Sequence, residues 1–130
     1  MSAPLFLLDT SFFVGREQGR LTGADIDIAG AGAVAVVTLA ELHLGVLMAK
    51  DATTRAQRLF TLVQAQAFQA LPADTNAAER FAGLVAYSRE QGRSLKVQDA
   101  WIAAIAATNG ATIVTQDNDF DGLPVDVLKV

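Results

Sequence analysis

Short apolar runs alternate along this chain with longer stretches of helical periodicity, and this alternation limits the folds that it can adopt. Four runs read as buried strands: PLFLLD (4–9), AVAVVT (33–38), TIVT (112–115) and VDVLKV (125–130). A brief further strand is expected within QALPAD (69–74). Apolar runs without polar alternation are typical of parallel strands, because such strands are buried on both faces of the sheet.

Helical patterns fill the intervals between these runs. Residues 39 to about 70 carry apolar side chains at spacings of three and four, with a break near Asp51, which predicts two helices. Further helices are expected over about 76–91 and within 97–110, whereas the polar, glycine-rich segment 15–33 predicts at most a short helix before a loop. Strands separated by helices indicate an α/β fold with a mostly parallel sheet of four to five strands and helices on both faces.

The length and composition are those of one globular domain over residues 1–130. Hydrophobic residues make up 52% of the chain, and no apolar run reaches the roughly 18 residues that a membrane span requires. The N-terminus lacks a basic start and meets Asp9 early, which favours a strand over a secretion signal. The absence of cysteine excludes disulfides and thiolate metal sites. We therefore expect a cytoplasmic protein that does not bind a membrane.

Carboxylates stand close after three of the predicted strands. Asp9 ends the first run, Glu41 lies one helical turn past the second, and Asp117 and Asp119 follow TIVT. Asp99 lies near the start of the helix that leads into TIVT. Ligands of open α/β sheets bind outside the carboxyl ends of the strands, so we expect these five acids to lie at one edge of the sheet.

Two of the acids have local explanations that the sequence leaves open. Thr38 and Glu41 match the S/T-x-x-E pattern of a capping box, in which each side chain bonds a backbone amide of the other residue. Asp9 with Thr10 and Ser11 is also a common way to begin a helix.

The other acids have local explanations as well. Asp117 and Asp119 suit a turn, and Asp99 suits the first turn of a helix, although Lys96 cannot accept the cap hydrogen bond that a capping box would need there. These explanations weaken when the acids are taken together. Four segments would have to bring an acid to the same sheet edge for unrelated reasons.

Clustered carboxylates repel one another and take up protons unless a cation shares the site. Oxygen ligands without cysteine or paired histidines indicate Mg²⁺, with Mn²⁺ as the alternative, and the lone His43 is expected to be a surface residue of a helix. The net charge of −4 argues against a nucleic-acid partner at first sight. However, five of the 14 acids belong to the candidate site, and the remaining nine are balanced by 10 basic residues.

The chain resembles the PIN-domain ribonucleases, and within them the VapC-type toxins of toxin–antitoxin pairs, over nearly its whole length. Four pieces carry the resemblance in the order and at the separations of that family: LLDTS (7–11), TLAELHLGV (38–46), GRSLKVQDAWIAAIA (92–106) and GATIVTQDNDFDGL (110–123). The resemblance implies a three-layer PIN-like fold. It also implies a catalytic set of four acids and a variable auxiliary acid. These are Asp9, Glu41, Asp99 and Asp117, with Asp119 as the auxiliary residue.

By this resemblance the protein is a Mg²⁺-dependent endoribonuclease that inhibits translation and growth as the toxin of its pair. Asp9, Asp99, Asp117 and Asp119 would bind the metal, and Glu41 would act through water. This chemistry also agrees with the residues alone, because carboxylates can hold metal ions that activate water against a phosphodiester. We further expect hydroxyl groups to hold the carboxylates in position, namely those of Thr10, Ser11 and Thr115.

The resemblance also implies partners: an RNA substrate, a VapB-like antitoxin and a second copy of the chain in a homodimer. Basic residues should flank the acids to receive RNA, and the candidates are Arg16, Arg20, Arg89, Arg93 and Lys96. The antitoxin is expected to pack on the helices of 39–70, and the candidate contacts are Leu42, Val46, Leu47 and Phe60. Lys96 and Gln116 depart from the family pattern, since relatives often have a capping hydroxyl and a basic residue there.

Two alternatives remain at this point. A nuclease of the same fold could process or degrade RNA without an antitoxin. A phospho-acceptor signalling domain also gathers acids and Mg²⁺ at the end of a parallel sheet. That design generally needs adjacent acids after the first strand and a lysine after a later one, and neither LFLLDTS nor TIVTQDND supplies them.

Overall fold

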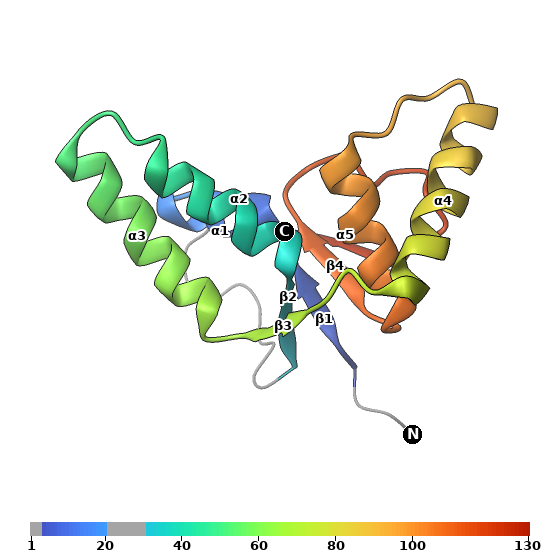
Figure 1. Cartoon of the computed structure of the whole chain (residues 1–130), viewed down its shortest axis with the longest axis horizontal. Helices are drawn as coiled ribbons and strands as arrows, with labels where there is room; N and C mark the ends of the chain where they lie inside the picture. The colour runs from blue at the N-terminus through green and yellow to red at the C-terminus, as the bar shows by residue number, and fades with distance from the viewer. Residues whose placement is uncertain (1–3, 21–30) are drawn as a thin grey trace.

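A five-stranded parallel sheet forms the centre of the molecule (Figure 1). The structure is a computed structural model that describes residues 4–20 and 31–130. The strand order is β3-β2-β1-β4-β5, and all four pairs of neighbouring strands are parallel. The strands are β1 (Phe6–Leu8), β2 (Gly32–Ala35), β3 (Gln69–Leu71), β4 (Thr112–Thr115) and β5 (Val127–Lys129). The predicted α/β fold with a parallel sheet is confirmed.

Five helices cover the two faces of this sheet, so that the fold has three layers. On one face lie α4 and α5, and on the other lie α1, α2 and α3, as the two groups of ribbons in Figure 1 show. The helices are α1 (Thr10–Glu17), α2 (Val36–Leu47), α3 (Ala52–Gln66), α4 (Thr75–Glu90) and α5 (Val97–Thr108). None of the helices in the described ranges is long and apolar enough to cross a bilayer.

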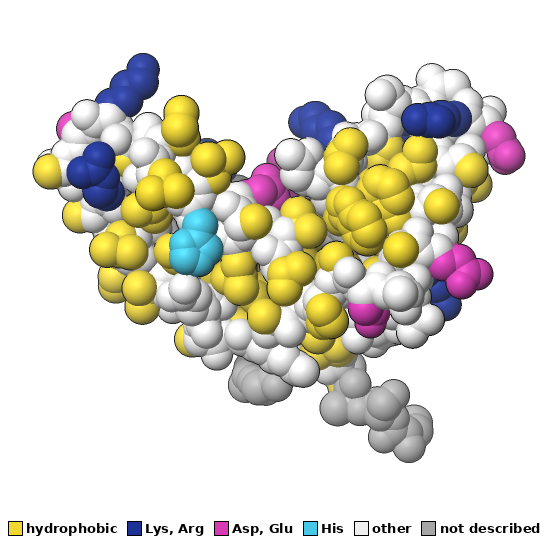
Figure 2. Space-filling view, in the orientation of Figure 1, with side chains coloured by type: hydrophobic (Ala, Val, Ile, Leu, Met, Phe, Trp, Pro, Cys, Tyr) yellow, Lys and Arg dark blue, Asp and Glu magenta, His cyan; other side chains and the backbone are white. Residues whose placement is uncertain are grey.

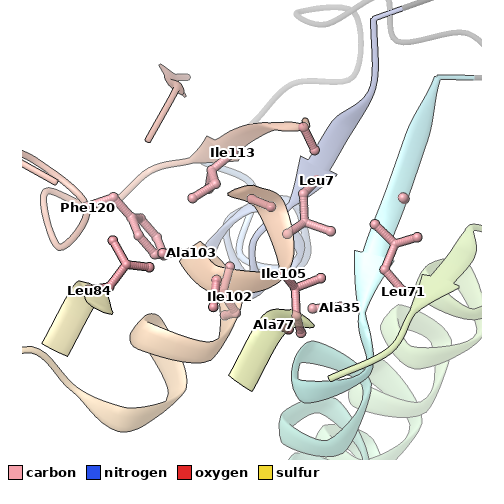
Figure 3. Packing of buried hydrophobic residues seen from close by; sticks show 14 of the residues in the cluster. Leu7, Ala35, Leu71, Ala77, Leu84, Ile102, Ala103, Ile105, Ile113 and Phe120 are labelled. Carbon is pink, nitrogen blue, oxygen red and sulfur yellow. The ribbon is translucent and has the colours of Figure 1, made fainter. Parts of the chain in front are cut away.

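The strands alternate their side chains between two hydrophobic cores. Leu7 of β1 and Ile113 of β4 pack with α4 and α5, and Figure 3 shows them beside residues of α5 such as Ile105. Leu8 and its neighbour Val114 point to the opposite face, toward α1, α2 and α3. This alternation follows from the two-residue period of a strand. Because both faces are buried, the carboxyl ends of β1 and β4 are held in fixed positions.

Two predicted boundaries differ from those in the structure. Strand β2 ends at Ala35, and the residues Val36–Thr38, which the valine-rich run placed in a strand, form the first turn of α2. Ala35 is paired with Leu71, the last residue of β3, and the residue that follows β3 is Pro72, which has no amide hydrogen to continue the ladder. Helix α1 begins at Thr10, before the segment 15–33 where a short helix was expected and in agreement with the helix start that Asp9, Thr10 and Ser11 allowed. Most of the segment 15–33 lies outside the described residues.

Candidate active site

Asp9 is the buried centre of the candidate site, at the carboxyl end of the central strand. Its side chain is 2% exposed, and its Oδ2 accepts hydrogen bonds from Ser11 Oγ and Thr115 Oγ1, both at 2.9 Å. Asp9 does precede α1 as its N-cap residue, but its carboxylate makes no cap hydrogen bond. The helix-start interpretation therefore accounts for the backbone and not for the carboxylate. No described residue donates a hydrogen bond to Asp9 Oδ1.

Backbone amides orient the two hydroxyls that hold Asp9. The amide of Gln116 donates to Ser11 Oγ, and the amide of Asp117 donates to Thr115 Oγ1, each at 3.0 Å. Because each hydroxyl oxygen accepts from an amide, its own proton is directed at the carboxylate. The network therefore links Asp9 to the segment that carries Asp117. The hydroxyl contacts expected of Ser11 and Thr115 are present.

Glu41 projects from the second turn of α2 toward the start of α1. Thr10 Oγ1 donates to Glu41 Oε1 at 2.8 Å and lies 3.1 Å from Thr38 Oγ1. Since α2 begins at Val36 with Ala35 as its N-cap residue, Thr38 lies inside the helix and the capping-box interpretation is wrong. Burial raises the pKa of Glu41 and the charge of Asp9 adds to this, although the hydrogen bond from Thr10 opposes the shift.

Asp99 lies in the first turn of α5 and has the most strongly shifted pKa of the candidate acids. Burial raises the pKa of Asp99 to about 7, with further contributions from the charges of Asp119, Asp9 and Asp117, and Lys96 opposes the shift. Lys96 is the N-cap residue of α5 and makes no side-chain cap hydrogen bond, as its chemistry predicted. Asp99 thus carries a charge that its surroundings do not fully compensate.

Asp117 and Asp119 follow β4 and complete the group. The pKa of Asp117 is raised by burial first, and then by the charges of Asp9 and Asp119, while Lys96 and Arg20 oppose the shift. Asp119 Oδ2 lies 3.7 Å from Lys96 Nζ, which makes a loose and largely exposed ion pair. Electrostatic repulsion therefore links four of the acids: Asp9, Asp99, Asp117 and Asp119.

The site lies in a hollow between the two groups of helices. Figure 2 shows acidic side chains at the base of this hollow, near the places where α2 and α5 begin in Figure 1. A cavity of 280 Å³ beside it includes Thr10 and Glu41 in its lining. A larger cavity of 730 Å³ lies elsewhere, between α4 and the end of α5, and contains none of the candidate acids. We place the chemistry at the acids because a large volume alone supplies no reactive group.

The donor set fits a divalent cation by its chemistry. In the part of the chain that the structure describes, no three acidic or histidine side chains already enclose a metal position. The acids nevertheless raise one another's pKa, which is the imbalance that a hard cation would relieve. Asp99 and Asp117 are only partly buried, so their carboxylates can turn toward a cation beside Asp9. His43 is exposed on α2, as expected.

Comparison with known proteins identifies the class. The family model of the PIN domain matches residues 6–125, so the chain belongs to the PIN-domain family. Its relatives include Ribonuclease VapC5 of Mycobacterium tuberculosis, 41% identical over 95% of this chain and 94% of that protein. Ribonuclease VapC4 of the same organism is also 41% identical, over 95% of each chain. Within the PIN-domain family, the chain therefore belongs to the VapC ribonucleases.

Solved structures agree with this assignment. The crystal structure of VapBC-5 from Mycobacterium tuberculosis contains a chain that is 40% identical, with a TM-score of 0.78 and 98% of both chains covered. A chain of the DNA-bound VapBC structure from Salmonella typhimurium has a TM-score of 0.84 at 20% identity, which supports the fold alone. The predicted PIN-like fold is thus confirmed, and a phospho-acceptor domain is no longer an alternative.

Replacement of Asp99 by asparagine should stabilise the metal-free protein at neutral and alkaline pH. The pKa of about 7 in the folded state lies above the ordinary value of 3.8, so the stability of the wild type falls as pH rises through this interval. After allowance for partial exposure, Asp99→Asn should gain about 1 kcal/mol at about pH 8. The gain should fade as pH falls below the ordinary value of 3.8, where Asp99 is neutral in both the folded and the unfolded protein.

Urea unfolding in EDTA measures this difference, with Asp126→Asn as the matched control because Asp126 is exposed and precedes β5, at the end of the sheet opposite the acids. The control should match the wild type across the pH range. A wild type that is more stable than Asp99→Asn at about pH 8 would contradict the electrostatic account of the site.

Proposed function

We propose that the protein is a Mg²⁺-dependent endoribonuclease that acts in the cytoplasm as the toxin of a toxin–antitoxin pair. The observation that carries this proposal is the arrangement of acids from four chain segments around the buried Asp9, in a chain that belongs to the VapC ribonucleases. No side-chain nucleophile is needed, because a metal ion held by the acids can activate water to attack the phosphodiester.

Asp9, Asp99 and Asp117 would hold the cation, with Asp119 as a supporting ligand and Mn²⁺ as the alternative ion. When bound, the cation lowers the pKa of water and offsets negative charge on the phosphodiester. Ser11 and Thr115 keep Asp9 in one orientation through their hydrogen bonds. This leaves Asp9 Oδ1 for the cation.

Glu41 would accept the proton of the attacking water. Its carboxylate is fixed by the hydrogen bond from Thr10, and burial raises its pKa, which makes it a stronger base than an exposed glutamate. The water oxygen would then bond to phosphorus as the bond from phosphorus to the leaving oxygen breaks; the leaving oxygen takes up a proton from solvent, and Glu41 returns its proton to solvent. No covalent intermediate with the protein is needed.

Cleavage of a mixed RNA pool tests the activity and its site together. The purified protein should cut with Mg²⁺ and not with EDTA, and Asp9→Ala and Asp117→Asn should each lower the rate more than about a hundredfold, since each removes a proposed ligand. Asp126→Asn should cut like the wild type. Equal cutting by Asp9→Ala would show that the site is misassigned.

An exposed apolar surface on α2 and α3 supports the toxin role over that of a nuclease without an antitoxin. We define the α2–α3 apolar surface by side chains that are 49–78% exposed: Leu44, Leu47, Met48, Leu59, Phe60 and Val63. An extended patch of this kind marks an interaction site. We propose that an antitoxin segment packs here. We leave two of the expected contacts out of this surface, because Leu42 is 8% exposed and Val46 is partly buried against the core.

The relatives support this proposal because the VapBC-5 structure, with a chain 40% identical to this one, is of a member of the VapBC family of toxin–antitoxin systems. The homodimer expected from the family stays a prediction. A gene for a small antitoxin immediately upstream would favour the toxin role over RNA processing without an antitoxin.

Substitutions on the α2–α3 apolar surface should weaken antitoxin binding and leave RNA cleavage intact. Leu47→Ala and Phe60→Ala remove side chains that are 78% and 65% exposed, so the fold should lose little stability. Each should weaken capture of a co-expressed VapB-like antitoxin at least about tenfold if these residues anchor the contact. Leu128→Ala, on β5, is the control and should bind normally. Unchanged binding in both variants would place the antitoxin elsewhere.

A further inference from the structure

The contacts in the structure show which of the five basic residues that could bind RNA interact with the acids and which are held elsewhere. Arg93 is held within the protein, because its guanidinium donates to the backbone carbonyls of Asp119 and Asp121. Gly122 follows with φ +79°, and a Cβ there would lie 3.3 Å from Arg93 Nη1. Arg93 therefore fastens the segment that carries Asp119 to the connection between α4 and α5. We assign it a structural role.

For two more of these residues, the described contacts are with groups other than the acids. The guanidinium of Arg16 lies over the ring of Phe12, 5.6 Å from its centroid. Arg89, in the last turn of α4, lines a small cavity with Val85 and Leu95. The cations that oppose the raised pKa of Asp117 are instead Lys96 and Arg20.

Lys96 approaches the acids from the side of the sheet that α5 covers. Its Nζ lies 3.7 Å from Asp119 Oδ2, and its side chain is 74% exposed. A long, exposed ion pair of this kind contributes little to stability, so the ammonium can exchange Asp119 for another anion at low cost. Lys96 is also free of helix capping, since it makes no side-chain cap hydrogen bond.

Arg20 approaches from the opposite side, because it follows α1, which packs on the other face of the sheet. Its Nε donates to Gln116 Oε1 at 3.2 Å, and Gln116 directly precedes Asp117. Gln116 is held against α1 at Gly15, where a Cβ would lie 2.2 Å from Gln116 Oε1. The missing side chain at Gly15 thus lets Gln116 pack there and hold Arg20 near the acids.

We propose that Lys96 and Arg20 bind RNA phosphates on the two sides of the cleaved bond, so that the strand crosses the acids from α5 to α1. This inference rests on the proposed ribonuclease function and identifies how that site receives a single strand. The acids alone repel phosphates, and a cation on each side offsets this repulsion for the incoming RNA. Both residues position the RNA, whereas the carboxylates bind the metal and accept the proton.

The test is steady-state cleavage of a mixed-sequence single-stranded RNA with Mg²⁺ at several KCl concentrations. Lys96→Met and Arg20→Met should each raise KM about threefold to fivefold and change kcat less than about twofold, as expected for the loss of an exposed charge contact. Each should also reduce the slope of log kcat/KM against log salt by about 0.7, the value for one phosphate contact to a single strand. The double variant should combine both losses, because the residues share no described hydrogen-bond partner.

Lys50→Met is the matched control, since Lys50 is an exposed lysine between α2 and α3. It should retain the KM and the salt slope of the wild type, and Lys96→Arg should largely restore both values. An active wild type whose KM and salt slope are unchanged in Lys96→Met and Arg20→Met overturns this inference alone. A wild type that cuts no RNA overturns the proposed function and this inference with it.

Discussion

The buried carboxylate of Asp9 is the constraint on which the rest of the site depends. A carboxylate removed from water is costly unless it is hydrogen-bonded and paired with positive charge. Ser11 and Thr115 supply the hydrogen bonds, and the amides of Gln116 and Asp117 orient them. These groups come from the end of β4 and from the first turn of α1, which directly follows β1, so the pairing of two central strands also builds the centre of the site.

The remaining acids lower the stability of the folded protein, because their charges repel one another. Asp99 and Asp117 have raised pKa values because they are partly buried and face other carboxylates. Lys96 and Arg20 reduce this repulsion without removing it. A protein built only for stability would not gather these groups, whereas a protein that binds a divalent cation gains affinity from them. The same excess of negative charge explains why Lys96 and Arg20 lie at the edges of the site, where an RNA strand would arrive.

The sequence predicted those parts of the structure that depend on local pattern. TIVT is β4 as expected, and the strand-end rule led to Asp9 and Asp117 without knowledge of the fold. The alternation of strands and helices indicates parallel strands, and parallel neighbours end at the same edge of the sheet. Asp9 and Asp117 share this edge because β1 and β4 are parallel neighbours. Lys96 was correctly excluded as a helix cap because an ammonium cannot accept a hydrogen bond.

Other features depend on contacts between distant residues, which a linear pattern does not contain. The end of β2 agrees with the position of Pro72, which directly follows the neighbouring strand β3 and is 36 positions beyond Val36. Thr10 holds Glu41 across a separation of 31 residues, and Gly15 admits Gln116 from another element. Leu42 and Leu47 lie on one helix with similar chemistry, but the packing of α3 and α1 buries the first and leaves the second exposed.

Anomalous diffraction of Mn²⁺ in crystals of the protein would show directly whether the acids around Asp9 bind a divalent cation. We expect a manganese peak at the carboxyl edge of the sheet, within coordination distance of carboxylate oxygens from Asp9, Asp99 and Asp117, and we expect Asp9→Ala crystals to lose this peak. A peak bound only at other residues, or one that persists at the same place in Asp9→Ala, would contradict this expectation.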